Sequence, residues 1–152
     1  MYGEVARRRP GAGADDDWFV ALTHASGVVS HLGATLHDAA AGLRFRVTGS
    51  AGAYEKRGLD PQEAALGAGA RPGDPGYGEE PAARWGRVTF GTSGGAGEPA
   101  AVPTLPGAYG AFYAGVRDAA LGLAPPPVAA EDAAAGLDVL EAARLGRPTD
   151  LP

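Results

Sequence analysis

Residues 18–36 read WFVALTHASGVVSHLGATL, two apolar and β-branched runs on either side of Ser26-Gly27. Such runs around a short glycine-containing turn predict two antiparallel strands joined by a tight hairpin. A two-residue loop would pair His24 with Val29 and Leu22 with His31. One face would then carry Trp18, Val20, Leu22, His24, Val29 and His31, and the other Phe19, Ala21, Thr23, Val28, Ser30, Leu32 and Leu36. Because both faces are largely apolar, we expect each to be covered.

Further strands are predicted on both sides of this hairpin. Short runs with strand composition lie at 2–8, 43–48, 53–57, 87–92 and 100–104, separated by Gly- and Pro-rich turns. Within 43–48, Leu43, Phe45 and Val47 alternate with polar residues, the pattern of a half-buried strand. The sequence therefore predicts a mainly antiparallel sheet.

Two helices are predicted after the last strand. Apolar residues recur at helical spacing from Tyr109 to Leu123, and a second helix is predicted from about Ala130 to Leu145, with Ala133, Leu137 and Leu140 facing the core. Strands first and helices last favour an α+β fold, an open sheet with the helices on one face. The length of 152 residues suits a single domain, 1–152.

Composition excludes several classes of protein. The chain has no cysteine, so disulfides and thiol chemistry are excluded. A net charge of -5 argues against a nucleic-acid binder, and no apolar stretch is long enough to cross a membrane. We therefore expect a cytoplasmic protein without a nucleic-acid or membrane partner. The runs Arg7-Arg8-Arg9 and Asp15-Asp16-Asp17 are interpreted as solvated charges at strand ends or in loops.

No motif in the chain completes a catalytic, cofactor or metal site. The glycine-rich segments 49–52 and 94–97 lead into strands, whereas a dinucleotide fingerprint opens a helix. In the register above, His24 and His31 lie diagonally on one face, but no third zinc ligand can be named there. No serine has the G-x-S-x-G context of a nucleophile elbow. We therefore predict no catalytic residue, no metal ligand and no cofactor bound by this chain alone.

The long segment from Gly58 to Gly86 has one predicted helical turn. Asp60 is the expected N-cap, Pro61 the first helical residue and Glu63 the third. A loop of this length in a compact domain is usually functional or covered by another part of the protein.

A series of motifs identifies a family. The chain reads RFRVTGSAGAY from Arg44, GLDPQE from Gly58, GDPGYGEEP from Gly73 and then Trp85-Gly86, followed by PTLPG from Pro103, PPPV from Pro125 and EDA from Glu131. This order resembles the C-terminal domain of the Gfo/Idh/MocA family of NAD(P)-dependent oxidoreductases over nearly the whole chain. It is most similar to the scyllo-inositol dehydrogenase-like branch.

The resemblance implies one half of a two-domain enzyme. In this family an N-terminal Rossmann domain holds NAD or NADP, and a Glu-Lys-Pro lysine and an Asp-x-x-x-His motif precede the region matched here. Neither motif is found in this sequence, and Lys56 is not that lysine. The open sheet face commonly forms a dimer contact in the family, which agrees with the two apolar faces of the hairpin. Ala129 departs from the family pattern, where Thr or Ser usually stands before the last helix.

Three hypotheses remain open. The chain could be the substrate-side and dimerisation domain of a sugar or polyol dehydrogenase that transfers hydride to or from NAD(P), inactive on its own and completed by a missing Rossmann domain. It could instead be a non-enzymatic dimerisation or ligand-binding module, or the product of a truncated reading frame. The candidates for a substrate-facing surface lie in the long loop and the strand before it: Tyr54, Lys56, Asp60, Gln62 and Trp85. The alternative is that these residues only fix the loop.

Overall fold

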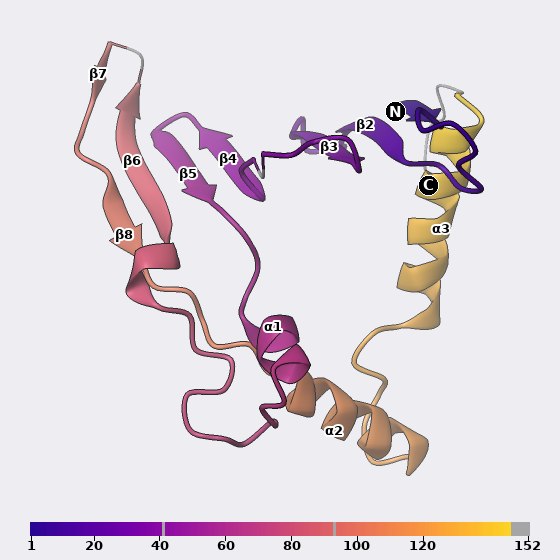
Figure 1. The fold of residues 1–152 in the computed structure, drawn as a ribbon, viewed down its shortest axis with the longest axis vertical. Helices are drawn as coiled ribbons and strands as arrows, with labels where there is room; N and C mark the ends of the chain where they lie inside the picture. Colours follow the sequence, from indigo (N-terminus) through magenta and orange to yellow (C-terminus); the bar gives the residue numbers. More distant parts are fainter. Residues whose placement is uncertain (41, 93, 147–152) are drawn as a thin grey trace. The chain divides into compact units, whose positions relative to one another are not determined.

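The computed structural model describes residues 1–40, 42–92 and 94–146 (Figure 1). The chain divides into two compact units, here called unit 1 (Met1–Ala39 with Val128–Pro152) and unit 2 (Ala40–Pro127). Each contains an open antiparallel sheet, and the helices follow or interrupt the strands, so the α+β class is confirmed. No helix among the described residues is long and apolar enough to cross a membrane.

Unit 1 is a three-stranded sheet and one helix. The strands β1 (Tyr2–Ala6), β2 (Asp17–Thr23) and β3 (Val29–Thr35) are ordered β1-β2-β3, both pairs antiparallel. The helix α3 (Ala130–Arg144) begins and ends within one residue of the predicted bounds. Its acidic first turn, with Glu131 and Asp132, and basic last turn, with Arg144, match the helix dipole.

The predicted register of the β2–β3 hairpin is wrong by one residue. The backbone N–H of His24 donates to Val28 O at 2.8 Å, and the N–H of Gly27 donates to His24 O at 2.8 Å, so the loop has three residues. Gly27 has a φ of +84°, as a three-residue hairpin loop with a left-handed last residue requires. Leu22 therefore pairs with Ser30, and Ala21 pairs with His31. This places His24 and His31 on opposite faces.

Helix α3 covers one face of the sheet. A Cβ on Gly3 would lie 2.7 Å from Ala143 Cα, so only glycine permits this close approach. Val20, paired with Gly3, is 3% exposed, and Ala142 and Ala143 are buried on the helix. Leu137 and Leu140, predicted to face the core, are instead more than half exposed.

Within unit 1, the opposite face of this sheet, here called the open face, is not covered by α3. It carries Tyr2, Phe19, Val29 and His31, with Phe19 38% and Val29 56% exposed. Leu22 and Leu32 lie on the covered side, in the same alternation as Val20. The expectation that something covers both faces is therefore met on one face of unit 1.

Unit 2 contains the second sheet. The strands are β4 (Phe45–Gly49), β5 (Gly52–Lys56), β6 (Gly86–Thr92), β7 (Gly95–Ala96) and β8 (Ala100–Val102), all antiparallel. They are ordered β4-β5-β6-β7, and β8 also pairs with β6. The edge strand β4 is exposed along its whole length, so the predicted half-burial of Phe45 and Val47 is not observed.

Unit 2 also contains three helical segments. The long connection between β5 and β6 carries α1 (Gln62–Gly67) and the 3₁₀ turn η1 (Ala82–Arg84), and α2 (Tyr109–Ala120) follows β8 (Figure 1). Helix α1 begins at Gln62, one residue later than predicted. The Asp60 carboxylate still accepts a hydrogen bond from the Gln62 backbone N–H at 3.0 Å, which is the expected N-terminal role.

Candidate functional site

The Lys56 ammonium forms the centre of a buried polar cluster. It ends β5, is 7% exposed, and its Nζ lies 2.5 Å from Glu80 Oε2 and 3.2 Å from the Arg84 carbonyl oxygen. The Thr104 hydroxyl donates to the same Glu80 oxygen. A charge buried this completely requires a partner, and Glu80 supplies it.

The Glu80 carboxylate is asymmetrically satisfied. Burial raises its pKa, but the hydrogen bonds from Lys56 and Thr104 outweigh burial, so the net pKa is lowered and the group is ionised. Its second oxygen, Oε1, is buried without a hydrogen-bond partner, and the Arg84 Nε lies 3.8 Å away. Buried carboxylate oxygens without a donor are uncommon in folded proteins.

Trp85 and Tyr54 flank this cluster. The Trp85 indole N–H donates to the Glu80 carbonyl oxygen at 3.0 Å. The Tyr54 ring occupies the space that a side chain at position 86 would need, so Gly86 is required there by close approach. Both aromatic residues are half-buried. Trp85 therefore packs beside Glu80, and Tyr54 packs against Gly86.

Asp60 and Gln62 form a second cluster around Gly107. Gln62 is 1% exposed, and its Oε1 accepts the backbone N–H of Tyr109 at 2.8 Å. This bond caps α2, because Ala108 has no side-chain acceptor to offer. A Cβ on Gly107 would overlap the Gln62 amide and the Asp60 carboxylate. Gly107 N–H also donates to Gly78 O at 3.1 Å.

Both clusters are built from the motifs singled out in the sequence. The GLDPQE segment supplies Asp60 and Gln62, the GDPGYGEEP segment supplies Gly78 and Glu80, and PTLPG supplies Thr104 and Gly107. The structure therefore brings Lys56 and Trp85 together around Glu80, and Asp60 and Gln62 around Gly107. Glu80, Thr104 and Gly107 were missed as site residues, although all three lie in quoted motifs.

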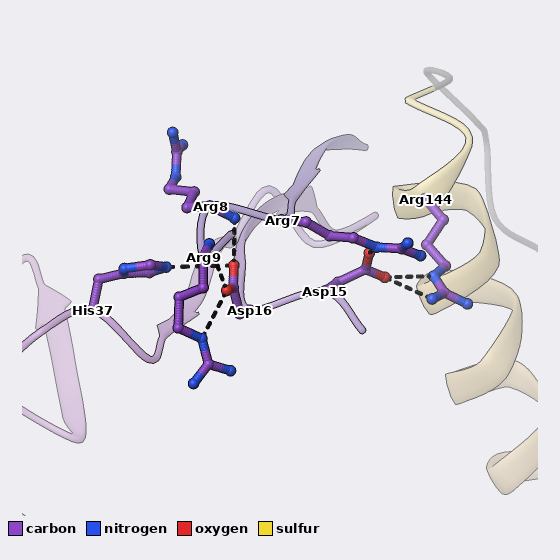
Figure 2. Close-up of polar contacts among 7 residues, drawn as sticks. All are labelled: Arg7, Arg8, Arg9, Asp15, Asp16, His37 and Arg144. Carbon is purple, nitrogen blue, oxygen red and sulfur yellow. Dashed lines mark hydrogen bonds and ion pairs between the residues drawn. The ribbon is translucent and has the colours of Figure 1, made fainter. Parts of the chain in front are cut away.

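A third polar cluster lies in unit 1 around Asp16 (Figure 2). Its carboxylate, 1% exposed, accepts the backbone N–H groups of Arg8 at 2.7 Å and Arg9 at 3.0 Å, and the Arg9 Nε at 3.0 Å. The His37 Nε2 lies 3.4 Å from Asp16 Oδ1, the oxygen that also accepts the Arg8 N–H. The Arg8 backbone N–H, with Arg9 and His37, outweighs burial and holds the Asp16 pKa far below its usual value.

The prediction that Asp15-Asp16-Asp17 is a set of solvated charges is therefore wrong. Asp15 pairs with Arg7 and with Arg144 of α3, the latter at 2.6 Å (Figure 2), and Asp17 pairs with Arg8. The two runs face each other across the β1–β2 turn, so each carboxylate meets a guanidinium. Opposite charge at a spacing of eight residues was the signal that could have revealed this.

The histidines do not converge. His24 Nε2 lies 2.9 Å from Ser30 Oγ on the covered face, and the His31 ring packs against Phe19 on the open face, with centroids 5.7 Å apart. Among residues 1–40, 42–92 and 94–146, no group of three His, Asp or Glu side chains could hold a metal ion.

Comparison with known proteins identifies the family. A family model described as the C-terminal α/β domain of the oxidoreductase family, of the Gfo/Idh/MocA type, matches residues 1–147. The chain belongs to this family. The E. coli K12 protein named "Uncharacterized oxidoreductase YdgJ" is 36% identical over 142 residues, which are 93% of this chain and 40% of YdgJ.

Solved structures of oxidoreductases share the fold of this Gfo/Idh/MocA domain. The putative oxidoreductase yvaA of Bacillus subtilis matches with a TM-score of 0.85 and 25% identity over 95% of this chain and 41% of that one. The putative oxidoreductase YPO2259 of Yersinia pestis matches with a TM-score of 0.78 and 36% identity, over 95% and 40%. The chain thus spans about two fifths of the length of these relatives.

A dinucleotide does not fit the described helix termini of this Gfo/Idh/MocA domain. Pyrophosphate sites need a glycine-rich turn between a strand and a helix whose first N–H groups are free. At α2, the Tyr109 N–H is already bonded to Gln62. At α3, the first turn carries Glu131 and Asp132, which repel phosphate. Helix α1 follows Asp60, whose carboxylate already takes the Gln62 N–H.

Proposed function

We propose that this chain is the substrate-side and dimerisation domain of an NAD(P)-dependent oxidoreductase that acts on a sugar or polyol, as the scyllo-inositol dehydrogenase-like branch does. The observation that carries the proposal is that the family motifs join in two polar clusters, one with the buried Lys56–Glu80 pair and one with the partly buried hydrogen bond from the Tyr109 N–H to Gln62. Membership of an oxidoreductase family supports this reaction class.

In this proposal the cofactor domain supplies the redox chemistry. When bound to a Rossmann domain, NAD(P) exchanges hydride with a hydroxyl or carbonyl carbon. The residues of this chain have another task. The buried Lys56, Gln62 and Glu80 hold the β5–β6 connection in place, and the partly exposed Asp60, Tyr54 and Trp85 are the candidates that face a substrate.

Titration with NAD(P)H tests the division of labour. The chain alone should give no saturable change in nicotinamide fluorescence, because its described helix N-termini lack a free phosphate site. Saturable binding at micromolar concentration would overturn this assignment. Joined to a Rossmann domain, the chain should support NAD(P)-linked oxidation of inositols or sugars, and oxidation of hydroxy acids alone would contradict the substrate class.

Self-association through the open face of unit 1 is the second part of the proposal. Phe19 and Val29 are exposed there, and solvent-exposed apolar patches of this kind commonly mark interfaces, most often two-fold ones. Phe19→Arg should give a folded monomer by light scattering, whereas His24→Arg on the other face should leave assembly unchanged. A wild-type chain that is monomeric at tens of micromolar would contradict the interface.

An alternative is a non-enzymatic dimerisation or ligand-binding module. The observation that favours it is the exposed apolar face of unit 1 with Phe19 and Val29, which a dimerisation module would use equally well. The module would dimerise as described but show no activity with any Rossmann domain. The joined-domain assay therefore separates the two proposals.

A further inference from the structure

A long connection joins β5 and β6, which are neighbouring, paired strands of one sheet. Residues 58–85, here called the lid, leave β5 after Lys56 and return at Gly86 (Figure 1). Gly58 and Gly78 have φ of +74° and +81°, which side-chain-bearing residues rarely adopt. The tip, residues 66–76, is exposed or half-buried throughout. The lid is therefore held mainly by its base.

Hydrogen bonds and an ion pair connect this base to residues outside the lid. On one side, Glu80 binds Lys56 and Thr104, and Lys56 also binds the Arg84 carbonyl. On the other side, Gln62 Oε1 accepts the Tyr109 N–H and Gly78 O accepts the Gly107 N–H. We name these five contacts the seam.

Apolar burial contributes little to the seam. The two leucines of the lid, Leu59 and Leu66, are 51% and 38% exposed, and no apolar side chain of residues 58–85 is buried. The half-buried aromatic residues of the lid are Tyr77 and Trp85, so opening the lid exposes apolar surface mainly from these two rings. Segments with few buried apolar contacts are the ones that open below the free energy of global unfolding.

The ion pair at the base is incompletely satisfied. Glu80 Oε1 has no hydrogen-bond partner, while Arg84 Nε stands 3.8 Å away and its side chain is 54% exposed. A buried oxygen without a donor costs part of the stabilisation that the closed state gains from Lys56. The electrostatic contact that holds the closed state therefore leaves one carboxylate oxygen without a hydrogen bond.

We propose that residues 58–85 open and close as a unit, controlled by the Lys56–Glu80–Thr104 contact, while β4, β5 and β6 stay paired. The inference rests on the proposed function in one respect: the lid would admit the substrate to the side bearing Asp60 and Trp85. Gated loops of this kind set access and turnover in many enzymes.

Amide hydrogen exchange of the 152-residue chain tests the proposal. The backbone N–H groups of Gly107 and Tyr109 lie outside the lid, but their acceptors, Gly78 O and Gln62 Oε1, lie within it. These two amides should exchange faster than the paired amides of β5 and β6, with a weaker dependence on denaturant, because only the lid must open.

Variants of the contact should change exchange at the seam selectively. Glu80→Gln should accelerate exchange at Gly107 and Tyr109 by roughly 100-fold, since it strands a buried ammonium. Thr104→Val removes the hydroxyl that donates to the same carboxylate and should accelerate exchange at the two amides about tenfold. The matched control is Arg46→Gln, which breaks an exposed ion pair with Glu55 in the same sheet and should change neither amide.

The proposal fails if Gly107, Tyr109 and the β5–β6 amides exchange together, or if the variants accelerate all of them equally. Either outcome makes the contact part of one cooperative core. If Glu80→Gln does not fold, the smaller Thr104→Val change decides between the same outcomes. The measurement needs neither cofactor nor partner, so its result is independent of the NAD(P)H titration and of the assembly test.

Discussion

Unit 1 has an apolar interior with one buried carboxylate, Asp16, whereas the interior of unit 2 is polar. The buried apolar residues of the described chain, Val20, Ala142 and Ala143, all lie in unit 1, where a helix packs on a sheet. The buried side chains of unit 2 are polar: Lys56, Gln62 and Glu80. Apolar packing is non-directional, whereas a buried hydrogen bond needs a particular partner at a particular distance. The interior of unit 2 should therefore depend more strictly on the identity of each residue, and single substitutions should destabilise it more easily.

The largest expected effect is on the apolar interior. Val20→Arg places an unpaired charge between the sheet and α3, and should destabilise unit 1 by roughly 3–5 kcal/mol. The Trp18 emission, in β2, should report the loss at a lower denaturant concentration, while the Gly107 and Tyr109 amides of unit 2 stay protected. Simultaneous loss in both units would show that the two are one cooperative block.

Asp16 tests the electrostatic part of unit 1. Asp16→Asn removes a carboxylate that accepts from Arg8 and Arg9 and should lower the melting temperature by several degrees at neutral pH. The folded-state pKa of Asp16 is depressed, so its contribution is fully present above the unfolded value near 3.9 and is lost as pH falls toward the folded value. The difference between wild type and variant should shrink below about pH 4. A difference that is constant with pH would contradict the assignment.

Gln62 tests the polar interior with a residue of nearly the same size. Gln62→Leu keeps the volume but leaves the Tyr109 N–H without an acceptor, and should cost unit 2 about 2 kcal/mol. Chemical denaturation followed by α2 helicity measures it. Glu63→Leu is the matched control, one residue along on the exposed side of α1, and should change stability little. Equal effects would mean that the hydrogen bond from the Tyr109 N–H to Gln62 is not decisive.

The smallest effect is a gain in unit 1. Ala129 precedes α3 with extended backbone, φ −72° and ψ 146°, and offers no side-chain acceptor to the first turn. Ala129→Ser should raise the free energy of unfolding by about 1 kcal/mol, because a hydroxyl can accept an orphan N–H. Ala129→Val serves as the control without an acceptor. An unchanged melting midpoint for the serine variant would argue against this helix start.

The positions of helices and strands were predictable from the sequence, but the register of strand pairing was not. Helix α3 lies within a residue of its predicted bounds, because charge and apolar spacing mark both ends. The register of β2 and β3 failed because Ala25-Ser26-Gly27 forms a three-residue loop, and loop length decides which face each side chain takes. His24 and His31, which were expected on one face, lie on opposite faces because of that one-residue shift.

Burial of polar residues was equally hard to predict. Glu80 lies in a Gly- and Pro-rich stretch that reads as an exposed loop, and only its contact with Lys56, twenty-four residues away, makes it interior. Asp16 looks like its neighbours Asp15 and Asp17, but it alone meets two backbone N–H groups at once. The Lys56–Glu80 contact between distant segments has no local sequence signal, and the facing charged runs around Asp16 do not by themselves tell which carboxylate is buried.

The makeup of unit 1 has a consequence for biosynthesis. Asp15 near the start of the chain and Arg144 near its end are partners 129 positions apart, and residues 40–127 are synthesised between them. On the ribosome, unit 2 is complete before α3 emerges. Until then, the face of the first sheet that Ala143 later covers remains without its helix. The polar interior thus assembles first and locally, and the apolar interior closes last, across the largest loop in the molecule.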